Sequence, residues 1–261
     1  MAKASERAAN SFVKLLYIGA SGTGKTGSLV SLAEAGYQLR ILDMDNGLDS
    51  LIAFAAHKDK KLLDQIDYQT FRDKFKSDPI KGAVVSGQPK AYVDAIKSMN
   101  KWDDGTLPET WGDNTVFVLD SLTAFGRAAF HWAQGMNASA KDPRQWYGAA
   151  QESIKTVLEL LTSEAFGAHL IIISHIDLVE MPDGLTRGFA SSIGKALGPT
   201  IPKYFNTMIL AESKGAGENV KRTITTLPNG FIDLKSPKPF DMPKSLPLET
   251  GMATIFKTLR S

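Results

Sequence analysis

The chain has 261 residues, 43% of them hydrophobic, which is enough to bury one sizeable core, so a single domain is the simplest expectation. The absence of cysteine excludes disulfides, thiolate metal sites and cysteine catalysis. With 30 basic and 28 acidic residues the net charge is +2, so any nucleic-acid site must be local.

No apolar run reaches the roughly 18 residues that a membrane span needs, and the N-terminal segment has no apolar signal core. We therefore expect a cytoplasmic protein that does not contact a membrane, in the host cytoplasm if the chain is of phage origin. Within one domain, we expect a flexible N-terminus over 1–11, a core over 12–211 and a C-terminal hairpin with a short helix over 212–261.

The first predicted elements are a strand, a glycine-rich loop and a helix. Residues 14–19 (KLLYIG) are apolar and stop at a glycine, which is typical of a buried strand. Residues 25–36 carry apolar side chains at helical spacing and end at Gly36. Residues 38–44 form the next predicted strand, and a strand–helix–strand unit predicts that it pairs in parallel with the first.

The remaining chain alternates between helical and strand patterns, which predicts an α/β fold with a mainly parallel sheet. The segment after Asp177 is expected to be irregular, because glycines, serines and prolines interrupt it. The predicted strands are 66–71, 115–120, 169–175 and a C-terminal meander or hairpin over 206–212, 222–227 and 230–235; the predicted helices are 89–100 and 146–164.

Residues 19–26, GASGTGKT, match the phosphate-binding loop G-x-x-x-x-G-K-[ST] at every fixed position. Glycines allow the backbone N–H groups to surround a phosphate, and the following helix presents its positive end to it. Lys25 would then contact the β- and γ-phosphates, and Thr26 would be a ligand of Mg²⁺. The predicted nucleotide contacts are Gly19, Ala20, Ser21, Gly22, Thr23, Gly24, Lys25, Thr26 and Gly27.

Carboxylates follow two of the predicted strands. Asp120 ends the apolar run 115–120, where a carboxylate can hold Mg²⁺ through water at the carboxyl edge of the sheet. Hydrolysis also needs a base that activates a water beside the γ-phosphate. Asp45 is our candidate and Asp43 the alternative, although either aspartate could instead cap the next helix. His175, after the strand 169–175, could sense the γ-phosphate together with Ser174.

Four spaced motifs, GASGTGKT, ILDMDNGLDSL, VFVLDSLTAF and LIIISHI, resemble the ATPase core of RecA-like recombinases. The chain is most similar to the small RecA-like ATPases of phages that are linked to single-strand annealing. The resemblance implies a RecA-like P-loop fold that binds ATP and Mg²⁺. It makes Lys25 and Thr26 the Walker A pair, Asp120 the Walker B carboxylate and Ser174–His175 a polar sensor pair. Asp45 stands where the family has its catalytic glutamate, which is one methylene longer.

The same resemblance implies that single-stranded DNA contacts the loops after the third and fourth strands. These are residues 135–148 and 177–190, which are rich in cations and aromatics suited to phosphates and stacked bases. The alternative is that both are ordinary surface loops whose aromatics cover the core. The candidate DNA contacts are Lys141, Arg144, Trp146 and Arg187.

Assembly is expected as well, because the family places a basic residue against the phosphate of a neighbouring subunit. Arg222 or Lys235, near the predicted C-terminal hairpin, is the candidate for this contact in trans, so a homo-oligomer is predicted. A single-strand-binding protein is a further partner that the resemblance suggests.

Three functional classes fit these motifs. The first is a RecA-like ATPase that acts on single-stranded DNA in phage-type recombination, annealing or repair. The second is a small-molecule kinase, in which a substrate hydroxyl attacks the γ-phosphate. The third is a nucleotide-dependent adaptor that binds ATP but hydrolyses little of it, an alternative that the aspartate at position 45 keeps open.

Overall fold

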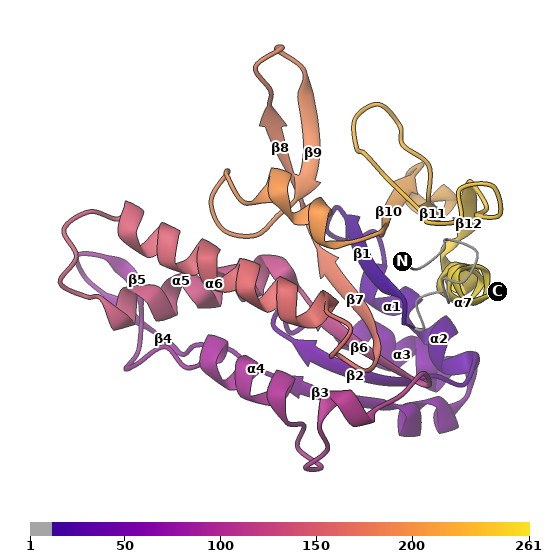
Figure 1. Cartoon of the computed structure of the whole chain (residues 1–261), viewed down its shortest axis with the longest axis horizontal. Helices are drawn as coiled ribbons and strands as arrows, with labels where there is room; N and C mark the ends of the chain where they lie inside the picture. The colour runs from indigo at the N-terminus through magenta and orange to yellow at the C-terminus, as the bar shows by residue number, and fades with distance from the viewer. Residues whose placement is uncertain (1–11) are drawn as a thin grey trace, which may run out of the picture.

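The computed structural model describes residues 12–261, so the predicted flexible N-terminus, residues 1–11, lies outside the described residues. One eight-stranded sheet dominates the described chain (Figure 1). In spatial order its strands are β12 (Ser245–Pro247), β11 (Lys221–Thr225), β10 (Thr207–Lys214), β1 (Lys14–Gly19), β7 (His169–Ser174), β6 (Thr115–Asp120), β2 (Gln38–Asp43) and β3 (Ile66–Thr70).

The strands from β10 to β3 are parallel to one another, whereas β11 and β12 are added in antiparallel pairing. This confirms the predicted fold class, a mainly parallel α/β sheet flanked by helices with an antiparallel C-terminal part. Two short hairpins project from the body: β4 (Phe75–Asp78) with β5 (Gly82–Val85), and β8 (Ile176–Glu180) with β9 (Thr186–Ala190).

Helices cover both faces of the sheet because its strands are apolar on both sides (Figure 1). In β1, Leu15 and Tyr17 pack into one core and Leu16 and Ile18 into the other, as strand alternation requires. The first core is closed by α1 (Lys25–Ser28), α2 (Val30–Glu34), α3 (Asp49–Lys58) and α7 (Leu248–Arg260); the second is closed by α4 (Ala91–Asn100), α5 (Leu122–Met136) and α6 (Arg144–Thr162).

Short 3₁₀ helices complete the chain: η2 (Lys60–Gln65), η3 (Pro108–Thr110), η4 (Gly198–Tyr204) and η5 (Gly217–Asn219). None of the helices in residues 12–261 combines the length and the apolar character that crossing a membrane would take.

The predicted pairing of the first two strands was wrong. Strands β7 and β6 lie between β1 and β2, so the helical segment 25–36 leads to a strand three places away. The hydrophobic patterns of β6 and β7 resemble those of β1 and β2; β1, β6 and β7 are buried throughout, and β2 is buried over Ile41–Asp43. Strand order is therefore decided by packing rather than by any local signal.

Two further predictions are corrected by the structure. Residues 230–235 form no strand, only an isolated bridge between Lys235 and Met208, because Gly230 has a φ of +78° and Ile232 turns into the core. The first part of the segment after Asp177 is the ordered hairpin β8–β9, whereas residues 191–206 are irregular as expected, apart from η4. Helix α5 was not predicted, although Ser121 caps it by accepting a hydrogen bond from the Ala124 N–H.

The sheet brings the functional strand ends together. Strands β1, β7, β6 and β2 are parallel neighbours, so their carboxyl ends share one edge. Asp43 lies directly opposite Asp120 in the register, and Ile18, one residue before Gly19, lies opposite Ser174. The phosphate loop and the predicted carboxylates therefore meet at this edge.

Candidate nucleotide-binding site

The phosphate loop connects β1 to α1 as the sequence predicted. Gly24 is the N-cap of α1 with a φ of +87°, a conformation that L side chains rarely adopt. A Cβ atom at this position would also lie 2.5 Å from Cδ2 of Leu248 in α7. Position 24 therefore favours glycine for its backbone conformation, and a side chain there would also displace the end of Leu248.

The ammonium group of Lys25 is held by the loop itself. Its Nζ donates to the carbonyl oxygens of Gly19 and Ala20, both at 2.9 Å. Burial lowers the pKa of Lys25, and the charges of Asp120 and Asp45 oppose that shift. The side chain is thus a positive charge in a mostly buried position that faces two carboxylates.

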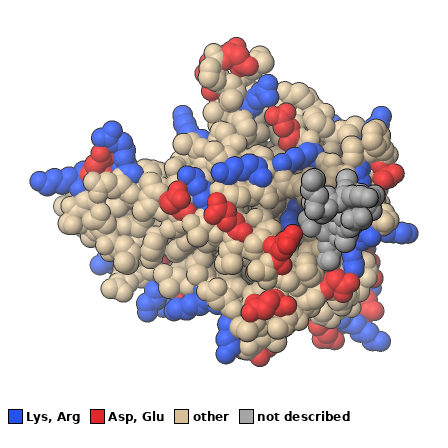
Figure 2. Space-filling model, in the orientation of Figure 1, with Lys and Arg blue, Asp and Glu red and all other residues tan. Residues whose placement is uncertain are grey.

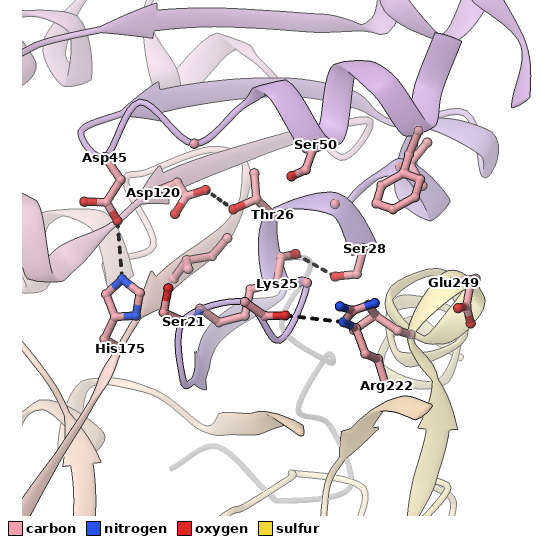
Figure 3. A pocket seen from close by; sticks show the side chains of 18 of the residues that line it. Ser21, Lys25, Thr26, Ser28, Asp45, Ser50, Asp120, His175, Arg222 and Glu249 are labelled. Atoms are coloured by element: carbon pink, nitrogen blue, oxygen red, sulfur yellow. Dashed lines mark hydrogen bonds and ion pairs between the residues drawn. The ribbon is translucent and has the colours of Figure 1, made fainter. Parts of the chain in front are cut away.

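Thr26 and Asp120 form the contact that the two Walker motifs predict. The Thr26 hydroxyl donates to Oδ2 of Asp120 at 2.6 Å (Figure 3). Burial raises the pKa of Asp120 to about 6, helped by the charges of Asp45 and Asp43 and opposed by the hydrogen bond from Thr26 and the charge of Lys25. A cation close to Asp120 therefore stabilises the ionised form of its carboxylate.

Asp45 and His175 face each other across the same site. The distance between Nε2 of His175 and Oδ2 of Asp45 is 3.6 Å, and about a third of each side chain is exposed (Figure 3). Burial alone would raise the pKa of Asp45, but the neighbouring side chains of His175 and Ser121 and the charge of Lys25 outweigh it and lower the pKa. Asp45 is thus an ionised carboxylate at the wall of the cavity.

Asp43 has a different environment. It is 2% exposed, accepts a hydrogen bond from the Gly47 N–H at 3.2 Å and accepts another from the Thr70 hydroxyl at 2.9 Å. Both carboxylate oxygens therefore fix the loop after β2 and the end of β3. Of the two aspartates left open by the sequence, only Asp45 lines the cavity.

The two members of the predicted sensor pair also separate. His175 lines the cavity, whereas the buried hydroxyl of Ser174 donates to the carbonyl oxygens of Ser191 (2.8 Å) and His175 (2.9 Å). The Thr123 hydroxyl accepts from the His175 N–H at 3.1 Å. Ser174 and Thr123 position the backbone that carries His175.

A cavity of about 620 Å³ extends from the phosphate loop, within the range of small-molecule sites. Of the predicted loop contacts, Ser21, Gly22, Gly24, Lys25, Thr26 and Gly27 line it. Gly19, Ala20 and Thr23 do not; the Thr23 hydroxyl donates to the Ala20 carbonyl oxygen at 2.8 Å and so shapes the loop.

The cavity wall includes residues that the motifs did not reveal. Phe54 of α3 is 49% exposed and lies so close to α1 that a Cβ at Gly27 would be 2.7 Å from its ring. Ser50 and Lys58 of α3 and Leu248 and Glu249 of α7 complete the wall. An aromatic residue shortly after Asp45, in the segment that the structure shows to be α3, was the sequence signal that could have indicated Phe54.

The two basic residues predicted to act in trans lie in different places. The Nε of Arg222 donates to the Gly22 carbonyl oxygen at 3.3 Å, so Arg222 lines the cavity of its own chain (Figure 3). The Nζ of Lys235 donates to the Pro202 carbonyl oxygen at 2.7 Å, and Lys235 does not line the cavity.

The candidate DNA contacts lie outside this cavity, on two projections of the molecule (Figure 1). Arg144 is exposed and pairs with Asp142 at 2.6 Å, while Arg187 of β9 pairs with Asp233 at 3.3 Å. Lys141 is exposed in the loop between α5 and α6. The indole N–H of Trp146 donates to the Asn137 carbonyl oxygen at 2.8 Å, and its ring packs partly against the core.

The sequence profile of the family described as AAA domain matches residues 11–237. The chain belongs to the AAA domain family. No curated protein matches the sequence.

Among solved structures, the fold is similar to a KaiC-like protein from Pyrococcus horikoshii OT3, with 13% identity, a TM-score of 0.41, and coverage of 82% of this chain and 78% of that one. It is also similar to the flagellar accessory protein FlaH from Methanocaldococcus jannaschii, with 14% identity, a TM-score of 0.45, and coverage of 91% and 84%.

Proteins of the AAA domain family have P-loops that bind a nucleotide, typically with Mg²⁺. The donors present here fit that ion, because Thr26 and Asp120 offer adjacent oxygens and Mg²⁺ usually takes one or two protein oxygens together with phosphates and waters. Within residues 12–261 there is no group of three or more Asp, Glu or His side chains that could hold a metal ion.

Proposed function

We propose that this chain binds ATP with Mg²⁺ and hydrolyses it, with Asp45 as the base. The observation that carries the proposal is the position of Asp45: it lines the cavity opposite Lys25 and within ion-pair distance of His175. Thr26 and Asp120 lie together at the same strand edge. A carboxylate, a lysine and a metal site around one phosphate loop are the components that phosphoryl transfer to water requires.

The chemistry divides among these residues. Lys25 and the loop N–H groups bind and orient the β- and γ-phosphates, and Thr26 and Asp120 would hold Mg²⁺, which would offset phosphate charge. Asp45 accepts the proton of a water whose oxygen forms the new bond to the γ-phosphorus, while the bond to the β–γ bridging oxygen breaks and ADP leaves. His175 orients the Asp45 carboxylate through the 3.6 Å contact.

Phe54 and Arg222 are proposed to contact the rest of the nucleotide. The exposed ring of Phe54 adjoins the α1 side of the phosphate loop, where a base can stack on it. Arg222 lies on the other side, against Gly22. These two side chains give the cavity an aromatic surface and a second cation beyond the phosphate loop.

We further propose that the ATPase acts on single-stranded DNA, in phage-type recombination, annealing or repair, as a homo-oligomer that can work beside a single-strand-binding protein. Support comes from the resemblance of the four motifs to RecA-like ATPases and from the exposed cations Lys141 and Arg144 on a projecting loop. Counterion release would make such binding strongly salt-dependent.

A nucleotide-dependent adaptor is the second candidate. The lowered pKa of Asp45 makes it a weak base. Because aspartate is one methylene shorter than glutamate, its carboxylate also lies farther from the attacking water. In that case the chain would bind ATP tightly and release phosphate very slowly.

The deciding experiment measures phosphate release by wild type, Asp45→Asn and Lys25→Ala, each with and without single-stranded DNA at low salt. The ATPase proposal expects Asp45→Asn to bind a fluorescent ATP analogue normally and to lose about 10²–10⁴-fold in rate. Lys25→Ala should lose nucleotide affinity as well. A wild-type rate indistinguishable from that of Asp45→Asn would favour the adaptor, and phosphate transferred to an added alcohol would favour a kinase.

A further inference from the structure

A second cavity, of about 410 Å³, lies beside the nucleotide cavity at the carboxyl edge of the sheet. Asp45 lines both cavities. Other walls of the second cavity come from Arg72 in the segment between β3 and β4, from Phe75 at the start of β4, and from α5, which includes Arg127 and His131. A ligand in this second cavity would therefore touch the residue that we propose as the catalytic base.

Two cationic side chains that line the second cavity have no ion-pair partner among the described residues. Arg72 and Arg127 are exposed and form no ion pair or side-chain hydrogen bond with any residue in 12–261. Both carboxylate oxygens of the neighbouring Asp73 already have partners. One accepts hydrogen bonds from the Lys90 and Ala91 N–H groups at 2.9 and 3.1 Å, and the other lies 3.0 Å from Nδ1 of His131. The guanidinium groups are thus available to an anion from outside.

The β4–β5 hairpin extends this cationic surface. Lys74, Lys76 and Lys81 are exposed on it, and they too have no ion-pair partner within the described residues. The carboxylate of Asp78 accepts from the Ile80 and Lys81 N–H groups and so is engaged by the turn. At the end of the molecule where Figure 1 places β4, β5 and the α5–α6 loop, Figure 2 shows several Lys and Arg side chains, with an acidic side chain among those at the tip.

An exposed aromatic ring stands among these cations. Phe75 is 55% exposed, lines the second cavity and is held edge-on against His131, with ring centroids 5.5 Å apart. Guanidinium groups bind phosphates in bidentate fashion, and an exposed ring stacks on a base. An acidic peptide would use the cations but not the ring.

From this combination we propose that single-stranded nucleic acid binds in the second cavity and along β4–β5, with a backbone phosphate against Arg72 and Arg127 and a base on Phe75. The inference rests on the proposed action on single-stranded DNA and assigns its main contact to a different surface from the loops 135–148 and 177–190. Because Asp45 is a shared wall, strand binding there changes the surroundings of the base and hence the rate of ATP hydrolysis.

The test compares the double variant Arg72→Ala/Arg127→Ala with Lys60→Ala/Lys61→Ala, which removes the same charge from exposed positions in η2. Fluorescence anisotropy of a labelled oligothymidylate is measured over a range of salt concentrations. The arginine variant should bind roughly tenfold more weakly at low salt, and the slope of log affinity against log salt should fall by about 1.4 for two lost phosphate contacts. The lysine variant should match wild type.

Nucleotide affinity and DNA-free phosphate release should be unchanged in the arginine variant, while the DNA-dependent change in rate is lost. An oligonucleotide carrying 5-iodouracil should crosslink to the Phe71–Phe75 segment on irradiation. If wild type binds DNA but both double variants bind equally well, or if the crosslink maps to 135–148 or 177–190, the second cavity is not the site although the proposed function stands. If wild type does not bind DNA at low salt, both fail. Equal competition by polyglutamate would overturn the nucleic-acid assignment.

Discussion

The hydroxyl oxygen of Thr26 and a carboxylate oxygen of Asp120 lie 2.6 Å apart, although 94 residues separate them in the chain. One belongs to the first turn of α1 and the other ends β6, and the parallel sheet holds both at one edge. This contact fixes where Mg²⁺ would bind relative to the phosphate loop. It also supplies the first of the predictions that follow.

Asp120→Asn should weaken nucleotide binding only when magnesium is present. The substitution removes a charged acceptor beside Thr26, and hydrogen bonds to charged groups are worth about 1.5–3 kcal/mol, so a loss of roughly 10- to 100-fold is expected. Titration of a fluorescent ATP analogue with Mg²⁺ and with EDTA measures the difference. Equal losses in both conditions would mean that Asp120 supports the loop and not the metal.

Asp43→Ala should lower the stability of the fold, whereas Asp45→Ala should leave it nearly unchanged. Loss of the Asp43 carboxylate leaves the Gly47 N–H and the Thr70 hydroxyl without their acceptor, which should lower the free energy of unfolding by about 1–3 kcal/mol. Asp45→Ala should change stability by less than about 0.5 kcal/mol, because Asp45 is part-exposed. Urea denaturation and phosphate release are measured for both. Hydrolysis that fell more for Asp43→Ala, after correction for folded protein, would transfer the role of base to Asp43.

Phe54→Ala should reduce affinity for ATP but not for inorganic tripolyphosphate. Stacking on an exposed aromatic contributes about 1–3 kcal/mol for each base, so the dissociation constant for ATP should rise roughly 5- to 100-fold. Calorimetric titration with both ligands separates the base from the phosphates. If the affinity for tripolyphosphate fell equally, Phe54 would be acting by packing against α1 near Gly27.

Arg222→Ala should impair nucleotide binding in its own chain. The 3.3 Å hydrogen bond to the Gly22 carbonyl places the guanidinium at the phosphate loop of the same molecule. Mixing Arg222→Ala with Lys25→Ala should therefore restore no phosphate release. Recovery of activity in the mixture would show that Arg222 serves a neighbouring subunit, as the family resemblance suggests, and Lys235→Ala mixed in the same way would test the other candidate.

His169 should make the fold sensitive to acid. Its Nδ1 accepts from the Val13 N–H and its Nε2 lies 2.9 Å from the Asp113 carbonyl oxygen, and burial lowers its pKa to about 4. As the pH falls from about 6.5 to 4, the unfolded chain binds a proton at this position before the folded chain does, so stability falls by up to about 3 kcal/mol.

The raised pKa of Asp120 has the opposite effect on stability over the same pH range. As the pH falls, the folded chain protonates Asp120 before the unfolded chain does, so this group adds stability. The comparison is therefore made between wild type and His169→Gln, by urea denaturation at pH 7 and at pH 4. The advantage of wild type over the variant should shrink as the pH falls. A constant difference would show that His169 does not titrate between the two values.

Local patterns in the sequence were sufficient for the phosphate loop, for the strands around it and for the α/β class. A phosphate loop is a contiguous segment whose glycine spacing dictates its own backbone, and a strand buried on both faces is apolar throughout. Helix α5 follows the same logic, since Ser121 and the apolar spacing after it mark a helix that the prediction omitted.

Contacts between distant segments had to come from the tertiary structure. The order of the strands, the pairing of Thr26 with Asp120 and the choice of Asp45 over Asp43 for the cavity wall all depend on which chain segments pack together. The same holds for Phe54 beside Gly27 and for the second cavity behind Asp45. A sequence fixes residue types and local conformations, whereas the burial of both sheet faces decides which residues meet.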